Sequence, residues 1–536
     1  YGVIDRSWQF MGKSAFADRA YWQWSATIEQ TLFEKLTLEA TFNRQDQKND
    51  VLNANTGAHE LRRDPNPLLP NGAANPYYNE LYIDNRFFLR KITNRVNDYR
   101  LSATYDLSLP FGISQRLLAF ATYRHDDFVG RTWEERATAN KAVQVWYRTY
   151  LKDYPNRDLE WKLIPGQTEL FGASFWGKNV NMLTSQSYVA LGSYWNGRIR
   201  SMVGYRRDQW DVDVQARVDA TVSGVVERVG FSPTVTPDPT IKDDSLSYGG
   251  VFHVLQDVHG ITASLVANYS ESFRPTGNSF DVFGKPMDPI KGKGTEFGAR
   301  LEFFSGKMAI TGTLFDIDVE HNRLAVSQTV RDEINTLFGA GTVDPTTLGT
   351  NGDTSTRNSK GYEFELALNL LKNWTLTANY SHNDLSDQQV YPRIRPYWER
   401  ARSENRPLTE YANLNTVVGN AVAESGWVSP ERDKNINAFT RYTFVRGPLK
   451  GVVVGGGVNY RDGAYLALAN GQPYFSPSST IINGLVGYKT KIAGKNVDFT
   501  LNINNLTDKI AYTSYGFASA QWASPREFRL SAVCKF

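Results

Sequence analysis

Apolar and polar residues alternate along segments of about ten residues through most of this chain. The odd positions are apolar in residues 101–108 and 497–504, and the even positions are apolar in residues 374–381. A period of two is typical of a β-strand that shows one face to an apolar environment and the other to a polar one. The pattern predicts about 17 strands of about 11 residues each, beginning near residues 22, 36, 99, 115, 186, 198, 246, 261, 295, 307, 361, 374, 434, 450, 480, 496 and 526.

The connections between these segments alternate strictly between short and long. The short ones are residues 33–35, 110–112, 195–197, 258–260, 305–307, 371–373, 446–448 and 493–495, and the long ones are approximately residues 45–95, 127–185, 208–243, 272–292, 320–358, 384–432, 462–478 and 507–524. Short turns at one rim and long loops at the other are typical of a transmembrane antiparallel β-barrel of outer-membrane type. A soluble sandwich would leave this alternation unexplained. An odd strand count would mean that the chain opens in mid-barrel and that strands precede Tyr1.

The two faces of the strands differ strongly in chemistry. One face carries residues such as Glu39, Thr41, Glu363 and Glu365, which favours a wet or plugged lumen, and the apolar face should then meet lipid. Aromatic residues near the strand ends, including Trp374 and Tyr380, suit the headgroup level of a membrane, although ordinary sheet packing is the alternative. The terminal strand, with Phe528 and Phe536, resembles the signal by which bacterial outer-membrane proteins are recognised for insertion.

Composition agrees with this class and excludes several others. The 536 residues include 13 Trp, 28 Tyr, 29 Phe and 42 Gly, and the formal net charge is +3. A mean hydropathy of −0.44 and the lack of a long apolar run exclude a helical membrane protein. Balanced charge gives no nucleic-acid footprint. The single cysteine, Cys534, excludes an internal disulfide framework and a cysteine zinc site.

Four short motifs follow one another in the second half of the chain. They are YSESFRP at 269–275, GKGTEFG at 292–298, KGYEFE at 360–365 and NNLTDK at 504–509. Their order resembles the C-terminal barrel region of TonB-dependent outer-membrane receptors, although Thr507 stands where that family usually has Phe. The resemblance implies a plugged barrel of about 22 strands. We therefore expect residues 1–536 to be a partial receptor barrel with long extracellular loops, with the plug domain, the TonB box and about five strands absent from this chain.

The resemblance also implies a function. A receptor of this family binds a scarce nutrient at the bacterial cell outer membrane, such as a siderophore-iron complex, a vitamin or an oligosaccharide, and imports it with energy supplied by TonB. The expected partners are outer-membrane lipid and lipopolysaccharide, the TonB system and the small-molecule or oligosaccharide ligand, and no nucleic acid is expected. A passive porin and a surface-binding protein, adhesin or outer-membrane enzyme are the alternatives.

Candidate chemistry is confined to the long loops. The six histidines are scattered without a metal-binding spacing, so we expect no catalytic residue, metal or cofactor, and His321 with its acidic neighbours is better explained as part of a lumen-facing stripe. Aromatic and cationic residues suited to stacking and anion pairing concentrate in two loops. They give the predicted ligand contacts Arg395, Tyr397, Trp398, Arg400, Trp133 and Trp146. Packing between loops and contact with lipopolysaccharide are the alternatives for these residues.

Overall fold

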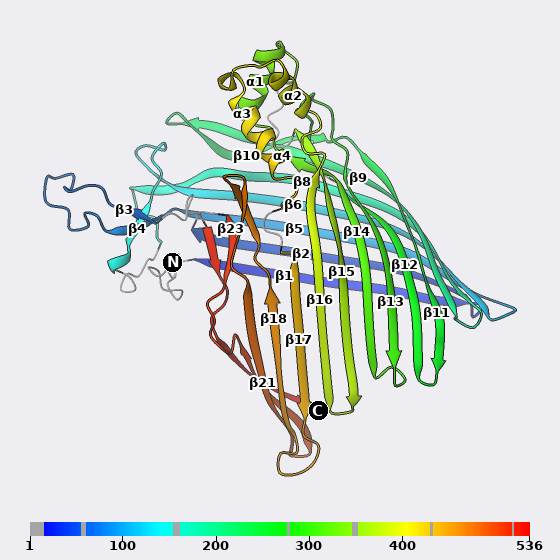
Figure 1. The fold of residues 1–536 in the computed structure, drawn as a ribbon. Coiled ribbons are helices and arrows are strands. Elements are labelled where there is room, and N and C mark those ends of the chain that lie inside the picture. Colours follow the sequence, from blue (N-terminus) through cyan, green and yellow to red (C-terminus); the bar gives the residue numbers. More distant parts are fainter. Residues whose placement is uncertain are drawn as a thin grey trace. The chain divides into compact units, whose positions relative to one another are not determined.

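Long antiparallel strands make up most of the chain (Figure 1). The computed structural model describes residues 15–54, 61–153, 161–275, 279–345, 352–428, 432–516 and 519–535. Eighteen strands form one sheet. They are β1 (Phe16–Leu32), β2 (Leu36–Ala54), β5 (Phe87–Leu109), β6 (Ile113–Ala137), β8 (Thr168–Tyr194), β9 (Ile199–Val222), β10 (Val225–Pro237), β11 (Ile241–Val258), β12 (Ile261–Arg274), β13 (Ile290–Phe303), β14 (Met308–Leu324), β15 (Asp353–Leu371), β16 (Trp374–Gln388), β17 (Lys434–Thr443), β18 (Val452–Arg461), β21 (Ser479–Ile492), β22 (Lys495–Asn504) and β25 (Glu527–Lys535).

Two of these strands share one position in the sheet. Strand β10 pairs with the later part of β9, and β11 pairs with the earlier part of the same strand. In the pairing of β11 with β9, the backbone amide of His253 on β11 donates to the carbonyl of Arg198, just before β9, over 2.9 Å. Seventeen of the eighteen strands in this sheet correspond to predicted strands, whereas β10 lies within the predicted long connection 208–243 and was not predicted.

The strands are longer than predicted. Strand β8 has 27 residues and β6 has 25, against an expected length of about 11. Strands of about 11 residues would leave most of the chain in loops, and this expectation is wrong because strands make up most of the described chain. Beyond the part of a strand that meets lipid, both faces contact water, so the alternation that reveals a strand disappears while the backbone ladder continues.

The short connections are tight turns, as predicted. The turn between β8 and β9 places Trp195, Asn196 and Gly197 at φ values of 48°, 56° and 84°. The turn residues Phe33, Phe111 and Phe304 also have left-handed φ values, of 51°, 63° and 56°. Large aromatic side chains thus occupy positions that normally favour glycine or asparagine.

Two of the long connections contain helices, which corrects the expectation that residues 320–358 and 384–432 are loops. The first holds α1 (Gln328–Phe338), and the second holds α2 (Arg395–Ser403), η2 (Leu408–Glu410), α3 (Ala412–Leu414), η3 (Asn415–Gly419) and α4 (Asn420–Ala423). Ser327 caps α1 by accepting the Val330 amide. Val330 and Ile334 bury one face of that helix at a helical spacing. No helix among the described residues is long and apolar enough to cross a membrane.

Other long connections contain short strands. A three-stranded sheet joins β3 (Arg62–Arg63), β4 (Leu81–Asn85) and β7 (Tyr147–Tyr150), with η1 (Leu151–Asp153) following β7. Two hairpins pair β19 (Tyr465–Ala469) with β20 (Gln472–Phe475) and β23 (Tyr512–Gly516) with β24 (Ser519–Trp522). These elements give the long connections their own backbone hydrogen bonds.

The chain divides into two compact units. The first contains residues 1–104, 119–187 and 207–243, and the second contains residues 105–118, 188–206 and 244–536. The first unit has a buried cluster with Leu52 near the end of β2 and Phe87 at the start of β5, and the second has a helical cluster around Ile334 and Leu414.

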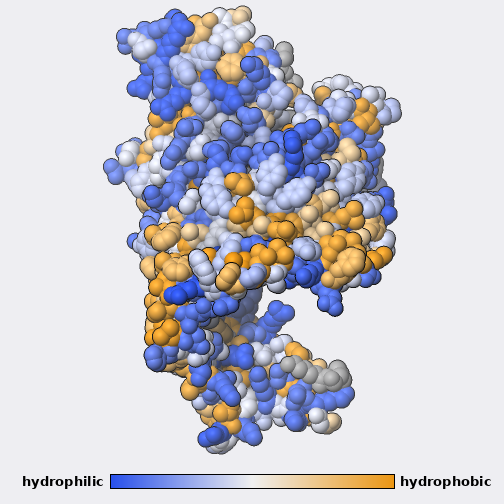
Figure 2. Space-filling view, turned by 90° about the vertical axis from the view of Figure 1, so that its right-hand side faces the viewer, coloured by the Kyte–Doolittle hydropathy of each residue, from blue (hydrophilic) through white to orange (hydrophobic). Residues whose placement is uncertain are grey.

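The strand walls leave large apolar side chains exposed instead of burying them. Leu314, Phe364 and Leu530 are exposed on their strands. On the face drawn in Figure 2, hydrophobic residues gather in a zone between more hydrophilic regions. Apolar rows facing outward from a sheet suit hydrocarbon as the surrounding medium, as the sequence pattern predicts.

The residues predicted for the membrane girdle and insertion signal lie on these walls. The Trp374 indole donates to the Thr440 hydroxyl over 2.9 Å, and the Tyr380 ring lies 5.9 Å from that of Tyr362. Phe528 is exposed on β25, and Phe536 lies outside the described residues. Their roles at the membrane stay predictions.

Candidate functional site

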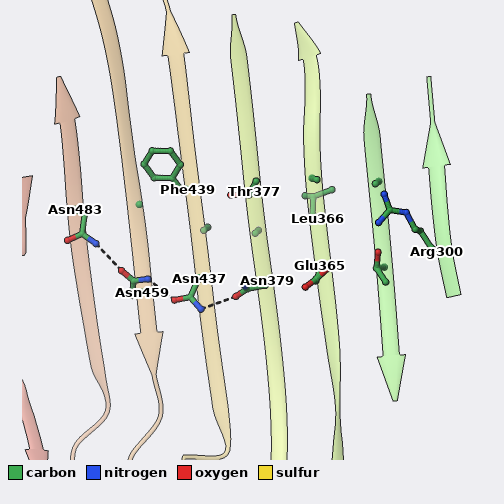
Figure 3. Close-up of a pocket in the computed structure, with 15 residues that line it drawn as sticks. Arg300, Glu365, Leu366, Thr377, Asn379, Asn437, Phe439, Asn459 and Asn483 are labelled. Carbon is green, nitrogen blue, oxygen red and sulfur yellow. Dashed lines mark hydrogen bonds between the residues drawn. The ribbon is translucent and has the colours of Figure 1, made fainter. Parts of the chain in front are cut away.

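A row of asparagine side chains crosses four neighbouring strands on the polar face of the second unit (Figure 3). The Nδ2 atom of Asn437 donates to Oδ1 of Asn379 over 2.9 Å, that of Asn459 to Asn437 over 2.6 Å, and that of Asn483 to Asn459 over 2.9 Å. The backbone amide of Asn505 then donates to Oδ1 of Asn483 over 3.0 Å. We call Asn379, Asn437, Asn459 and Asn483 the amide row. Each carboxamide therefore faces the next in a fixed direction.

The amide row borders a hollow of about 420 Å³. The hollow is lined by Arg300, Ala309, Thr311, Glu365, Leu366, Ala367, Thr377, Ala378, Asn379, Asn437, Ala438, Phe439, Gly457, Asn459 and Asn483. The Nε atom of Arg300 donates to Glu302 over 2.7 Å. An amide has two N–H groups and two acceptor lone pairs, so pairing within the row leaves groups able to bind polar molecules. The lining thus offers amide, hydroxyl and charged groups to a polar molecule.

The row ends at the motif NNLTDK of the sequence. The Asn505 side chain donates to the Lys509 and Ser524 carbonyls and accepts the Lys509 amide, while Asp508 accepts the Arg526 amide. Both ends of the long connection after β22 are thereby tied to the wall. This arrangement gives the motif a structural explanation that its sequence alone does not supply.

Two long connections of the second unit fold together into a small helical body. We call residues 325–345 and 389–428 the helical cap. Its buried cluster includes Val330, Ile334, Ile394, Trp398 and Leu414. The Glu333 carboxylate of α1 accepts the Asn413 and Leu414 amides at the start of α3. The cap is thus a packed structure and not a set of flexible loops.

Arg393 fastens the helical cap to the start of β15 and to the connection that precedes β13. Its Nε atom donates to Asp281 over 3.1 Å, and its Nη1 atom lies 3.5 Å from Oδ1 of Asp353. Asp353 is fully buried and accepts the backbone amides of Thr354, Arg393 and Ile394. Burial raises the pKa of Asp353 against the opposing effect of these hydrogen bonds.

The four predicted ligand contacts of this region have different environments. Trp398 is buried in the cap and donates to Asn415 over 3.0 Å, so packing occupies its ring. Tyr397 is half-buried, with its ring 5.5 Å from that of Phe338. Arg400 lies on the surface above Phe338 and donates to Glu404 over 2.7 Å. Arg395, also at the surface, donates to Glu399 over 2.8 Å.

The other two predicted contacts belong to the first unit. The ring of Trp133 lies edge-on to that of Trp176 at 5.5 Å, and the Arg131 guanidinium lies 5.6 Å from the Trp176 ring. Trp146 is nearly half exposed, and the Arg86 guanidinium lies 5.2 Å from its ring and 4.7 Å from that of Phe88. The structure therefore pairs each tryptophan with an arginine-containing cluster, which the sequence order does not reveal.

A buried carboxylate in the first unit was missed by sequence reasoning. Glu135 is fully buried and accepts the Tyr147 hydroxyl over 2.8 Å and the Trp161 indole N–H over 2.6 Å. Burial, with help from Glu135, raises the pKa of Tyr147. No local pattern marks Glu135, because its partners lie 12 and 26 residues away.

The acidic stripe near His321 makes internal contacts. Asp316 and Asp318 both accept the Asn358 amide, and Lys293 pairs with Glu320 over 2.7 Å. His321 contacts the Pro289 carbonyl over 3.1 Å. Across the part of the chain that the structure describes, no group of three histidine, cysteine or acidic residues is placed to hold a metal ion.

Comparison with known proteins gives a family and a set of relatives. A family model described as TonB dependent receptor-like, beta-barrel matches residues 23–506. The ferripyoverdine receptor of Pseudomonas aeruginosa is 24% identical over 309 residues, which are 56% of this chain and 31% of that protein. The ferrichrome outer membrane transporter/phage receptor of Escherichia coli is 24% identical over 298 residues, which are 54% of this chain and 32% of that protein.

Solved structures share the fold. The pyoverdine outer membrane receptor FpvA of Pseudomonas aeruginosa PAO1, bound to pyoverdine, matches with a TM-score of 0.69 and 17% identity over 99% of this chain. The siderophore receptor PiuA of Acinetobacter baumannii matches with a TM-score of 0.65 and 15% identity over 97% of it. The chain covers 64% of each of those two chains, and under a third of the two curated relatives.

Proposed function

Because this chain belongs to the TonB-dependent receptor-like β-barrel family, we propose that it is the barrel part of a receptor that imports a ferric siderophore. The chain is an outer-membrane protein. The observation that carries the proposal is the family match over residues 23–506, together with relatives whose names specify ferripyoverdine and ferrichrome. The siderophore class is thereby favoured over the vitamin and the oligosaccharide.

Ligand capture is assigned to the exposed aromatic and cationic groups of the long connections. Arg395, Tyr397 and Arg400 present cations beside an aromatic ring at the cap surface, and Trp146 with Arg86 does the same in the first unit. Such groups stack on flat chelating rings and pair with the negative charge of a metal chelate. We propose that Trp133 also contacts the ligand, as part of the cluster that it forms with Trp176 and Arg131. Trp398 supports the cap from inside, and lipopolysaccharide is a further proposed partner of the cap arginines.

Gating and energy supply belong to the whole protein. The family implies that a plug, preceded by a segment that binds TonB, rearranges to admit the ligand. The amide row supplies neutral polar groups on the wall that such a ligand would pass. The family comprises receptors and not enzymes, and we propose that this chain likewise has no catalytic activity.

Ligand binding by the cap can be tested directly. The double variant Tyr397→Ala/Arg400→Ala should weaken binding of a matching ferric siderophore by about tenfold, as expected for one stacking and one charged contact. The matched control is Glu410→Ala, on η2 of the same cap. Quenching of intrinsic fluorescence on titration gives the dissociation constant. Equal affinities for both variants would remove the cap surface from the proposal.

The wider proposal needs a transport assay. Deletion of the gene should abolish growth on at least one ferric siderophore under iron limitation, and the cloned gene should restore it. Growth on every tested ferric siderophore, together with loss of growth on a vitamin or an oligosaccharide, would change the ligand class.

A further inference from the structure

The short turns of the second unit share an unusual surface chemistry. We call residues 109–112, 195–198, 257–260, 304–307, 371–373, 444–451 and 492–495 the short-turn rim. Every one of these seven turns exposes a large apolar side chain: Phe111, Trp195, Val258, Phe304, Leu371, Val445 and Ile492 in chain order. The exposed fractions of Phe111, Trp195 and Phe304 are 87%, 62% and 60%. The described part of the chain therefore leaves most of the surface of these three side chains uncovered.

The aromatic residues at the rim occupy unfavourable backbone positions. Phe111, Trp195 and Phe304 have φ values of 63°, 48° and 56°. This left-handed region is open to glycine but rarely adopted by bulky residues. An exposed aromatic side chain on such a position stabilises neither the turn nor a core. Exposed aromatic residues at left-handed positions are explained if their side chains contact something other than this chain.

The rim is also basic. Its turns contain Arg198, Lys307, Lys372, Arg446, Lys450 and Lys495, against the single acidic residue Asp257. Within the described residues, Lys307, Lys372, Arg446 and Lys450 are exposed and form no ion pair. Apolar tips beside free cations match a surface that offers apolar material and negative charge together.

Backbone hydrogen bonds join the turns into one continuous edge. They run from Asn196 to Gly112, from His253 to Arg198, from Ser305 to Gly260, from Asn369 to Lys307, from Thr443 to Asn373 and from Lys489 to Gly451. Each donor lies in or beside the next turn, so neighbouring tips are held side by side. The rim is therefore an extended surface and not seven independent loops.

The rim continues the apolar outer wall. On β21, the exposed residues Ile482, Val486, Tyr488 and Ile492 occupy even positions and so share one face of the strand. That row ends at Ile492, which belongs to the rim. An apolar row that faces hydrocarbon brings the rim to the edge of the bilayer, on the side where such barrels place their short turns.

We propose that the short-turn rim is a membrane-anchoring surface that binds anionic phospholipid headgroups. The apolar tips enter the boundary between headgroups and acyl chains, and the lysine and arginine side chains contact lipid phosphates. Apolar side chains and cations together fit a bilayer surface with negative headgroups better than either alone. This role is independent of which nutrient the receptor imports. The short turn of the first unit also has an aromatic residue and a lysine, Phe33 and Lys35, with the acidic residue Glu34 between them.

Lipid binding to the purified full-length protein tests the cationic part. Native mass spectrometry of detergent-solubilised protein should show tighter binding of phosphatidylglycerol than of phosphatidylcholine. The variant Lys307→Gln/Lys372→Gln/Lys450→Gln should lower phosphatidylglycerol affinity by about fivefold for each lysine and leave phosphatidylcholine affinity unchanged. The matched control is Lys91→Gln/Lys242→Gln/Lys285→Gln, which removes three exposed lysines elsewhere and should change neither affinity. Equal behaviour of the two triple variants would overturn the proposal.

Fluorescence in reconstituted vesicles tests the apolar tips. The difference in fluorescence between the unmodified protein and Trp195→Phe gives the emission of Trp195. Lipids brominated near the headgroup should quench this emission, and acrylamide dissolved in the water should not. Quenching of this emission by acrylamide alone would place the rim in water and overturn the proposal. Protection from acrylamide that arises only after adding periplasmic extract would assign the rim to a protein partner and would also overturn it.

Discussion

Arg393 shows how one side chain organises residues that are far apart in the sequence. Its contacts reach Asp281 and Asp353, 112 and 40 residues away. Arg393 belongs to the helical cap, whereas Asp281 and Asp353 lie outside it, and Asp353 is fully buried. A buried carboxylate that accepts three backbone amides and faces a guanidinium is costly to disturb, because removing it leaves several donors and a cation without a partner.

The first prediction concerns Asp353. Asp353→Ala should destabilise the helical cap by about 3–5 kcal/mol, whereas Asp353→Asn, which keeps one acceptor oxygen, should cost less. Hydrogen exchange of amides in residues 389–428 measures the opening free energy. The control is Asp332→Asn on the exposed side of α1, which should leave protection unchanged. Full protection in Asp353→Ala would show that the cap does not depend on this contact.

The second prediction concerns pH. Burial raises the pKa of Asp353 above the 3.8 of a free aspartate, so the folded cap binds the proton more tightly than the unfolded chain. Cap stability should therefore fall as pH rises from 3.8 through the folded pKa, and this contribution should be constant at higher pH. The pH dependence of hydrogen exchange in the cap, corrected for intrinsic rates, measures it. Asp353→Asn should lose this dependence, and a profile identical to that of the unmodified protein would contradict the assignment.

At the scale of elements, the wall strands are defined by two faces of different chemistry. On β16, Thr377 and Asn379 line the hollow on the polar face, while the Trp374 indole on the other face contacts Thr440. Successive side chains point to opposite faces of a strand, so Leu376 lies on the face of Trp374. The same alternation appears in the sequence, which is why strand positions could be predicted.

The third prediction uses this difference between faces. Leu376→Arg should destabilise the inserted protein by about 2–4 kcal/mol, because it places a charge on the lipid face, while Thr377→Arg should cost far less. Urea titration of protein refolded into lipid vesicles gives the free energy of unfolding. The two substitutions introduce the same side chain at adjacent positions, so each controls for the other. Equal costs would mean that the faces have been assigned the wrong way round.

At the scale of the whole molecule, the proposed receptor function predicts transport that is driven by an energy source outside the barrel. A passive pore would admit its ligand without an energy source, whereas an energised receptor would stop importing its ligand when that source is removed. The amide row and the hollow beside it offer hydrogen bonds but no activated nucleophile. These polar groups suit contact with a polar ligand, as the proposed function requires.

The fourth prediction separates these two modes. Dissipating the proton gradient of intact cells with an uncoupler should stop uptake of a radiolabelled ferric siderophore but leave its binding at the cell surface unchanged. Cells that lack the gene measure uptake by other routes. Uptake that continues in the presence of the uncoupler would favour the passive pore.

The sequence by itself determined where most of the wall strands lie, the positions of the short turns between them, and the side of each strand that carries apolar residues, but not the strand lengths or β10. These features repeat every second residue or depend on turn residues, so neighbouring residues are enough to reveal them. The motifs near Tyr269, Gly361 and Asn505 indicated the family for the same reason, because each is a short run of adjacent residues.

Only the tertiary structure decided how the long connections fold and what their side chains contact. Trp398 is a ligand contact predicted from the sequence, and the structure places it in the core of the helical cap. The partners of Glu135, the anchor at Arg393 and the continuity of the short-turn rim all join residues that are distant along the chain. Such contacts depend on where the sheet brings separate segments together, and a local pattern of polar and apolar residues does not specify which distant segments meet.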